Sequence, residues 1–379
     1  MQPIKKLDSL RAIAVLLVVF YHWLPDTHFI NIFENGAIGV NIFFTLSGFL
    51  ISRILLENRS EAERLNNSKL VTLKSFYIRR ALRIFPIYYL LIFFLALSHG
   101  FLSAKFGKAE FINSITYTIN FHFFLIKDWG GIVAHFWSLA VEEQFYLFWP
   151  FIILFVNRKY LIHAIILFIL IGITSQCLIK DQEFGYLPTY TCFDSFGLGA
   201  LLAWIMMFKP HLLSRVYTTL SVASIVCFII LLTQINHGRW PYFPQRTMHS
   251  TIALWMITYV VMNKGKSRFS FSAFLNNRVL FFLGKISYGI YLYHLPLVWF
   301  AFTLSPLINK YLPFHFVKQH HNYVLLLVES CLLILFSWLS WKFIEKPILR
   351  LKKYFDYQPS LGKIKGKELS TQKLLPQNH

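Results

Sequence analysis

The chain has 379 residues, of which 56% are hydrophobic, 18% aromatic and only 14% charged. Soluble domains average about 25% charged residues, so this composition excludes an ordinary water-soluble protein and indicates a membrane protein. The formal net charge of +20 would suit a nucleic-acid partner, but the distribution of the cations along the chain argues against one.

Hydrophobic runs recur along the chain, each near the ~20 residues that a helix needs to cross a ~30 Å hydrocarbon layer. They cover residues 12–25, 37–56, 84–102, 136–156, 161–178, 191–208, 217–233, 249–262, 279–304 and 323–344. The first run has no small-residue cleavage site and contains His22, so we expect a retained helix and not a signal peptide. The sequence predicts an all-α, polytopic transmembrane helix bundle of about ten spans.

Lysine and arginine residues concentrate in alternate connections between these runs. With the N-terminus in the cytoplasm, most of the 37 Lys and Arg residues fall on the cytoplasmic side. We therefore predict that both termini are cytoplasmic. A transmembrane domain is expected over residues 1–347, and a basic, partly disordered cytoplasmic tail over residues 348–379. The basic balance is then a topology signal that also attracts anionic lipid, and no nucleic-acid partner is expected.

The four cysteines lie in apolar runs and show no metal-binding or redox spacing. We expect small buried hydrophobic residues at these positions, with an approach of Cys177 to Cys192 as the weaker alternative. No metal site is expected.

The first predicted helix carries ionisable residues at its entry and one in its apolar stretch. Asp8 and Arg11 are three residues apart and either form a local ion pair or belong to a site. His22 follows Arg11 by about 16 Å of helix, which places it slightly beyond the middle of a ~30 Å layer. A histidine at this depth either packs through a hydrogen bond to a neighbouring helix or exchanges a proton with a reacting oxygen.

Three arginines, Arg79, Arg80 and Arg83, stand where the third hydrophobic run begins. Arg80 and Arg83 share one face of a helix, whereas Arg79 points elsewhere. Planar guanidinium groups suit bidentate binding of phosphate oxygens, so this face is a candidate site for a nucleotide-like donor. The alternative is that all three are topology anchors.

A stripe of polar residues lies along the first part of the fourth hydrophobic run. His135, Ser138, Glu142 and Tyr146 recur at helical spacing, and Glu143 lies on a neighbouring face. A polar stripe on a membrane helix is expected to face the bundle interior. A carboxylate there can orient a histidine or act as a general acid or base, and a structural hydrogen-bond network is the alternative.

Two later ionisable residues are secondary candidates. Asp194 and His294 lie in apolar segments, where each either lines an interior site or makes a packed hydrogen bond. Small residues at Gly48, Gly197 and Gly199 are expected to allow close approach of helices.

Seven segments in this order resemble the acyltransferase family 3 of polytopic membrane enzymes, which move acyl groups from acyl-CoA to sugars and related acceptors. Together they span nearly the whole predicted membrane domain, which makes the resemblance specific. They are Leu7-Asp8-Ser9-Leu10-Arg11-Ala12 with His22, the segment 39–49 (GVNIFFTLSGF), the segment 76–86 (FYIRRALRIFP), the segment 136–146 (FWSLAVEEQFY), the Asp194 segment, the segment 287–294 (SYGIYLYH) and the segment 343–347 (FIEKP).

The resemblance implies roles for particular residues. The family's first-helix histidine falls on His22, where it would be a general base or a nucleophile, and its acidic motif falls on Glu142 and Glu143. Its arginine pair falls on Arg80 and Arg83, and these two residues with the adjacent Arg79 are the expected acyl-CoA-binding residues. Asn41 stands where an aspartate is common in the family, so no charge is expected to act there.

The resemblance also implies an activity. We expect an O-acetyltransferase of the bacterial inner membrane, with acetyl-CoA as co-substrate and no bound cofactor. The expected acceptor is a lipid-linked or surface glycan, such as lipopolysaccharide O-antigen or exopolysaccharide. Some members carry a C-terminal esterase-like domain, and we expect a stand-alone member without one. Oligomeric state is not indicated.

Two other readings remain open. The acceptor could be a small secondary metabolite such as a macrolide sugar. Buried His, Glu and Arg residues also suit a proton-coupled transporter, although transporters often show paired repeats and no internal similarity is evident in this sequence.

Overall fold

The structure is a computed structural model that describes residues 5–24, 28, 31, 35–98, 106–181, 183–237, 243–262, 271–311 and 323–357. Within these ranges every regular element is helical, which confirms the all-α prediction. Residues 238–242 and most of the predicted basic tail, from residue 358 onward, lie outside the described residues.

Each predicted hydrophobic run coincides with a long helix. These helices are α1 (Lys5–Trp23), α2 (Asn35–Arg64), α3 (Lys69–Leu97), α6 (Phe136–Phe155), α7 (Arg158–Leu178), α8 (Phe193–Phe208), α9 (Leu213–His237), α10 (Gln245–Met262), α13 (Ser287–Tyr311) and α14 (Tyr323–Ser340). Shorter helical segments connect them, namely α4 (Lys108–Ile115), α5 (Ile119–Ile126), η2 (Gly131–Val133), η3 (Thr189–Cys192), η4 (Pro210–Leu212), α11 (Phe271–Phe274), α12 (Arg278–Lys285), η5 (Trp341–Glu345), α15 (Lys346–Arg350) and η6 (Leu351–Tyr354).

Among the described residues, seven helices are long and apolar enough to cross a membrane. The helices α1, α10 and α13 are not among the seven. The charged entry of α1 and the polar first turns of α10 explain two of these differences. The chain is thus a polytopic membrane protein, and the count of ten spans stays a prediction.

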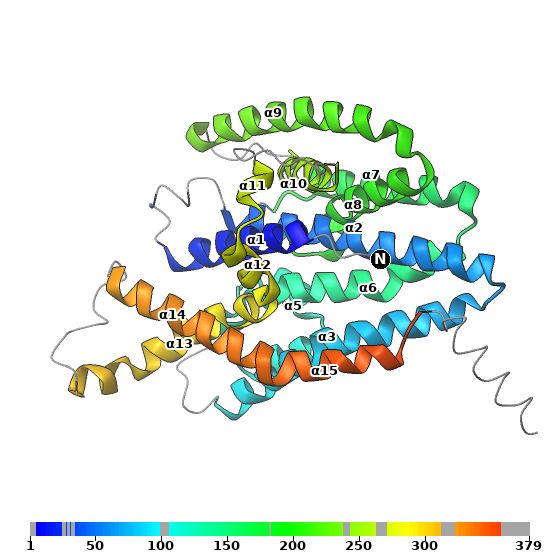
Figure 1. The fold of residues 1–379 in the computed structure, drawn as a ribbon. Helices are drawn as coiled ribbons and strands as arrows, with labels where there is room; N and C mark the ends of the chain where they lie inside the picture. The colour runs from blue at the N-terminus through cyan, green and yellow to red at the C-terminus, as the bar shows by residue number, and fades with distance from the viewer. Residues whose placement is uncertain are drawn as a thin grey trace, which may run out of the picture.

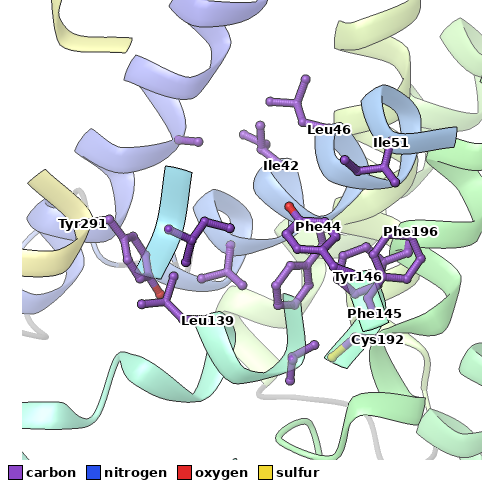
Figure 2. Close-up of a cluster of buried hydrophobic side chains, with 14 of the residues drawn as sticks. Ile42, Phe44, Leu46, Ile51, Leu139, Phe145, Tyr146, Cys192, Phe196 and Tyr291 are labelled. Carbon is purple, nitrogen blue, oxygen red and sulfur yellow. The ribbon is translucent and has the colours of Figure 1, made fainter. Parts of the chain in front are cut away.

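The centre of the bundle is formed by α2 and α8, which pack closely along their length. A Cβ at Gly48 would lie 2.1 Å from the carbonyl oxygen of Phe196, and a Cβ at Gly199 would lie 2.1 Å from that of Thr45. Only glycine permits this distance, so the expected close approach is confirmed. Phe196 also stacks on Phe145 of α6, with ring centroids 4.1 Å apart, in the buried cluster that Figure 2 shows.

The outer helices have the surface of lipid-facing elements. In Figure 1, α9 lies along one edge of the bundle and α14 along the opposite edge. Their outward side chains are large and apolar, for example Val222 and Ile225 on α9 and Leu327 on α14, each at least 60% exposed. Hydrocarbon is the environment in which such surfaces are stable.

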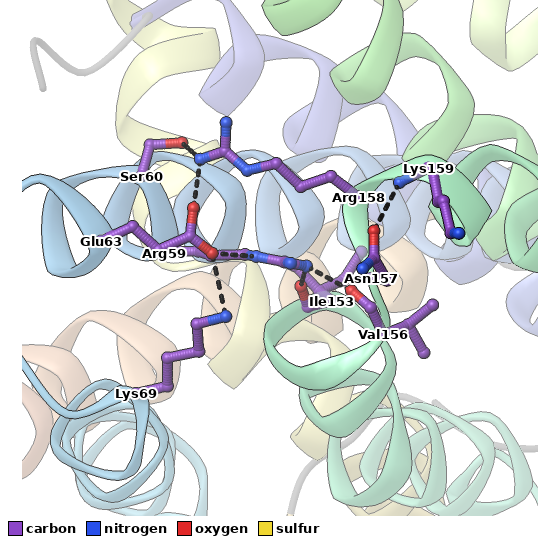
Figure 3. Close-up of polar contacts among 9 residues, drawn as sticks. All are labelled: Arg59, Ser60, Glu63, Lys69, Ile153, Val156, Asn157, Arg158 and Lys159. Atoms are coloured by element: carbon purple, nitrogen blue, oxygen red, sulfur yellow. Dashed lines mark hydrogen bonds and ion pairs between the residues drawn. The ribbon is translucent and has the colours of Figure 1, made fainter.

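One end of the bundle carries a cluster of ion pairs centred on Glu63 (Figure 3). The Glu63 carboxylate contacts Arg59 and Lys69, each at 2.9 Å, and also Arg158. Arg59 is buried and donates to the carbonyl oxygens of Ile153 at 2.6 Å and Val156 at 2.8 Å. The cluster ties the α2–α3 and α6–α7 connections together at what we call the basic end. Charge alternation predicts both connections on the cytoplasmic side, which stays a prediction.

Candidate functional site

Two pockets meet inside the bundle. The first, which we call the arginine pocket, has a cavity volume of about 90 Å³ and is lined by Arg11, Val40, Phe43, Phe44, Leu46, Ser47, Leu50, Arg80, Arg83, Ile84, Ser138, Leu139, Glu142, Glu143, Tyr146, Ser287, Tyr288 and Tyr291. The second, the histidine pocket, has a cavity volume of about 500 Å³ and is lined by Tyr21, His22, Gly36, Ala37, Val40, Asn41, Trp129, Gly131, Ala134, His135, Trp137, Gln176, Ile179, Asp181, Gly185, Tyr186, Phe243, Gln245, Arg246, His249, Tyr291, Leu295 and Trp299.

Val40 of α2 and Tyr291 of α13 line both pockets and form the wall between them. The Tyr291 hydroxyl contacts the hydroxyl of Ser138 and lies 3.2 Å from the carbonyl oxygen of His135. Ser138 and His135 are both candidate site residues from the sequence. Ser138 lines the arginine pocket, and His135 lines the histidine pocket. Val40 and Tyr291 therefore mark the boundary at which the two pockets adjoin.

The arginine pocket brings together the predicted arginine pair and the predicted acids. Arg80 lies over the Tyr146 ring, with Cζ 4.7 Å from the ring centroid. Arg83 lines the same pocket one turn further along α3. The predicted Asp8–Arg11 ion pair is confirmed at 2.6 Å, and the Arg11 side chain also reaches this pocket. Three guanidinium groups thus converge on one space.

Glu142 and Glu143 lie on the arginine side of the wall. The Glu142 carboxylate accepts hydrogen bonds from the hydroxyls of Ser47 and Tyr146, and the Tyr146 hydroxyl also lies 3.0 Å from Ser47 Oγ. Glu143 lines the pocket beside it. Neither carboxylate lines the histidine pocket, into which the His22 imidazole opens.

Arg79 is held away from both pockets. Its Nη1 donates to the carbonyl oxygens of Lys352 at 2.9 Å and Phe355 at 3.1 Å, and it contacts the Asp356 carboxylate at 3.3 Å. The α3 start is thereby tied to the segment after η6, and Arg79 is not part of the pocket that holds Arg80 and Arg83.

His22 lies in the last turn of α1 and opens into the histidine pocket. Its Nδ1 lies 3.0 Å from the carbonyl oxygen of Val18 and 3.2 Å from His294 Nε2, while His294 Nδ1 lies 2.6 Å from the carbonyl oxygen of Tyr291. A carbonyl oxygen only accepts, so both Nδ1 atoms carry the proton in the neutral rings. His294 Nε2 then accepts from His22, which leaves the lone pair of His22 Nε2 available.

The secondary candidates divide between the pocket and the surrounding packing. His294 is buried and reaches the site through His22, and the ring centroids of His135 and His294 lie 4.7 Å apart. Asp194 is fully buried and accepts from Thr247 Oγ1 at 2.7 Å, but it lines neither pocket. All four cysteines are free thiols. Among the described residues, no group of three or more His, Cys, Asp or Glu side chains is placed to hold a metal ion.

The profile of a family described as "Acyltransferase domain" matches residues 4–342 of the chain. The chain belongs to this acyltransferase family. The match runs from the start of α1 into η5 and so contains every residue that lines the two pockets. The resemblance drawn from the seven segments is confirmed.

Curated relatives of this family member come from Staphylococcus aureus. A protein of strain COL, provisionally named an O-acetyltransferase, is 29% identical over 95% of this chain and 60% of its own length. The O-acetyltransferase OatA of strain NCTC 8325 is 27% identical over 95% of this chain and 59% of its own length. The chain thus spans about 60% of the length of these relatives. No solved structure was found to match it.

Several pocket residues of this acyltransferase-family chain were not singled out from the sequence. Arg246 and His249 line the histidine pocket from the first turns of α10, and Trp129, Trp137 and Tyr186 add aromatic surface. Single polar residues at the edge of a hydrophobic run look like topology or interface residues. The signal that could have found Arg246 is a guanidinium three residues before a predicted span, on the outer, cation-poor side.

Proposed function

We propose that the chain is a membrane O-acyltransferase that takes an acyl group, acetyl in the simplest case, from acyl-CoA in the arginine pocket. The acceptor is a hydroxyl of a cell-surface glycan held in the histidine pocket. The observation that carries this proposal is the pair of pockets that share one wall, with three arginines on one side and an imidazole with an available lone pair on the other.

The donor pocket suits a nucleotide thioester. Arg11, Arg80 and Arg83 offer planar guanidinium groups to phosphate oxygens, which they bind more specifically than ammonium groups do. Glu142 holds Ser47 and Tyr146 in the same pocket, next to Arg80. The acyl end of the donor would extend toward Val40 and Tyr291, where the two pockets meet.

The transfer needs a base on the acceptor side of the wall. His22 Nε2 takes the proton of the acceptor hydroxyl, while the hydroxyl oxygen forms a bond to the carbonyl carbon of the thioester. The carbon–sulfur bond then breaks, and the proton passes from His22 to the departing CoA thiolate. His294 Nε2 accepts from His22 Nδ1–H throughout, and the carbonyl-rich C-terminal end of α1 favours the imidazolium that forms.

The acceptor and the location follow from the relatives and the geometry together. O-acetyltransferase names favour an acetyl group and a hydroxyl acceptor. The polar connections around residues 179–188 line the histidine pocket and are predicted on the outer side of the membrane, where a glycan is accessible. A bacterial plasma membrane places acyl-CoA on one side of such a protein and a surface glycan on the other.

The proposal is tested by replacing His22 in the full-length protein in its native membrane. His22→Ala should reduce incorporation of label from radiolabelled acetyl-CoA into surface glycan by at least 100-fold, because general base catalysis contributes ~10²–10⁴-fold. His163→Ala on the exposed face of α7 is the matched control and should retain transfer. Near-normal glycan acetylation in the His22→Ala strain would remove His22 from the reaction.

A further inference from the structure

Arg246 is a buried guanidinium in the wall of the histidine pocket, and the reaction described above does not use it. It lies in the first turn of α10 and is 9% exposed. Its Cζ lies 5.3 Å from the centroid of the Tyr186 ring and 5.7 Å from that of Trp137. Its Nη1 contacts the Cys192 sulfur, a weak acceptor. The group is held by aromatic faces and a thiol.

The nearby carboxylates are occupied elsewhere. Asp194 accepts from Thr247, and Asp181 pairs with Lys127. Burial alone would raise the pKa of Asp181, but Lys127 and the backbone N–H of Phe184 outweigh it, so the pKa lies below its usual value and the pair stays ionised at neutral pH. Among the described residues, no carboxylate lies within ion-pair distance of Arg246.

The buried Asp194 carboxylate interacts electrostatically with Arg246 but makes no direct ion pair with it. A buried cation without a direct ion pair is unfavourable, because a more distant opposite charge offsets only part of the desolvation of the charge. A buried arginine of this kind contributes little to the stability of the fold unless an anion binds to it. Because Arg246 lines an open pocket, that anion can arrive with a ligand.

The rest of the wall is suited to a sugar ring. Trp129 and Tyr186 lie at a shallow angle of 34° with centroids 5.7 Å apart, and Trp137 meets Tyr186 edge-on at 5.3 Å. Trp299 lines the pocket from α13. Aromatic faces pack against the C–H faces of a pyranose. The cavity volume of about 500 Å³ falls within the ~300–1,000 Å³ of ordinary small-molecule pockets, so a sugar unit fits.

We propose that the acceptor of this chain is an acidic sugar, and that Arg246 binds its carboxylate. This rests on the proposed function, because it specifies the substrate of the same pocket. The planar guanidinium group of Arg246 would donate hydrogen bonds to both carboxylate oxygens. The sugar ring would then lie against the aromatic side chains, with one of its hydroxyls directed toward His22 across the pocket. A neutral sugar of the same shape would lack the charged contact.

Binding can be measured without the transfer reaction. Full-length protein in phosphatidylcholine nanodiscs is titrated with D-glucuronate or D-glucose, and saturation-transfer NMR gives the dissociation constant of each. We expect glucuronate to bind at least 10-fold more tightly than glucose. Arg246→Gln should lose this preference, Arg246→Lys should keep part of it, and Arg215→Gln at the exposed start of α9 should leave it unchanged.

Several outcomes would overturn the acidic-sugar proposal. They are equal affinity for the two sugars, no saturable glucuronate binding, or unchanged glucuronate binding in Arg246→Gln. Loss of glucuronate binding when phosphatidylglycerol replaces phosphatidylcholine would assign Arg246 to a lipid headgroup instead. CoA binding to the arginine pocket serves as the folding check for each variant.

The assay separates this inference from the function on which it rests. Selective glucuronate binding in a protein that transfers no acetyl group would reject the transferase and keep the anion site. Transfer that depends on His22 but shows no preference for acidic acceptors would keep the transferase and reject the role of Arg246.

Discussion

Adjacent arginines at the start of α3 have different surroundings. Arg79 is bound to backbone carbonyl oxygens of the segment after η6, whereas Arg80 lies over Tyr146 in the arginine pocket. Residues one apart on a helix point about 100° away from each other, so the two guanidinium groups cannot serve one ligand. Only Arg80 and Arg83 face the space in which we place CoA phosphates.

This difference predicts the effect of replacing each arginine on CoA binding. Arg80→Ala combined with Arg83→Ala should raise the dissociation constant of CoA at least 10-fold, because each hydrogen bond to a charged group contributes about 1.5–3 kcal/mol. Isothermal titration in nanodiscs measures the constant. Arg79→Ala is the matched control and should leave CoA affinity unchanged. If CoA affinity falls equally in the double variant and in Arg79→Ala, the three arginines would instead be topology anchors.

At the level of single residues, helical spacing was informative where several polar groups recur on one face. His22, Arg80, Arg83, Glu142 and Glu143 all line a pocket, as expected for polar groups in membrane helices. The spacing does not say which helices become neighbours. The contact of His22 with His294, and the separation of both acids from it, depend on how α1, α6 and α13 pack.

At the level of elements, the packing of α2 against α8 depends on two glycines. The backbone of each helix occupies the space that a Cβ at Gly48 or Gly199 would need. These helices carry Val40 and the aromatic cluster that surrounds the site, so their spacing determines the pocket geometry. The sequence predicted the close approach from small residues, but not the partners, because small residues occur on several helices.

Adding one methyl group at this contact should destabilise the fold. Gly48→Ala would place a Cβ 2.1 Å from the Phe196 carbonyl oxygen, and overpacking of this kind costs about 1–3 kcal/mol. Thermal unfolding in detergent, followed by circular dichroism, should show a lower midpoint than the wild type. Gly107→Ala is the control, because its Cβ would meet only the flexible end of Glu110 at 3.2 Å. An unchanged midpoint in Gly48→Ala would contradict the tight packing of α2 on α8.

At the level of the whole molecule, the wall of Val40 and Tyr291 divides one interior into two compartments. The ion-pair cluster around Glu63 lies at the basic end, from which we propose that the arginine pocket is reached. The ten hydrophobic runs predicted the helical bundle, and the membrane orientation that the alternation of cations indicates stays a prediction. They did not predict the wall, because both residues are apolar or aromatic and lie inside ordinary membrane runs.

A larger side chain at Val40 should reduce acyl transfer without reducing CoA binding. Val40→Trp would fill the shared boundary, so acetyl transfer to glycan should fall by at least 100-fold while CoA affinity changes less than threefold. Transfer is measured with radiolabelled acetyl-CoA, and affinity by titration calorimetry. Val226→Trp, on the 49% exposed face of α9, is the control for a bulky residue in the membrane. Undiminished transfer by Val40→Trp would show that the acyl group does not cross at this boundary.

The same wall has a consequence for the cell that carries the protein. A water-filled bore from one face of the bundle to the other would conduct protons and dissipate the membrane potential. Val40 and the Tyr291 side chain, whose hydroxyl is bonded to Ser138, stand at the boundary between the two pockets, where they would interrupt such a bore. In the proposed orientation, an uncharged acetyl group can cross this boundary during each turnover, while the bilayer stays electrically insulated.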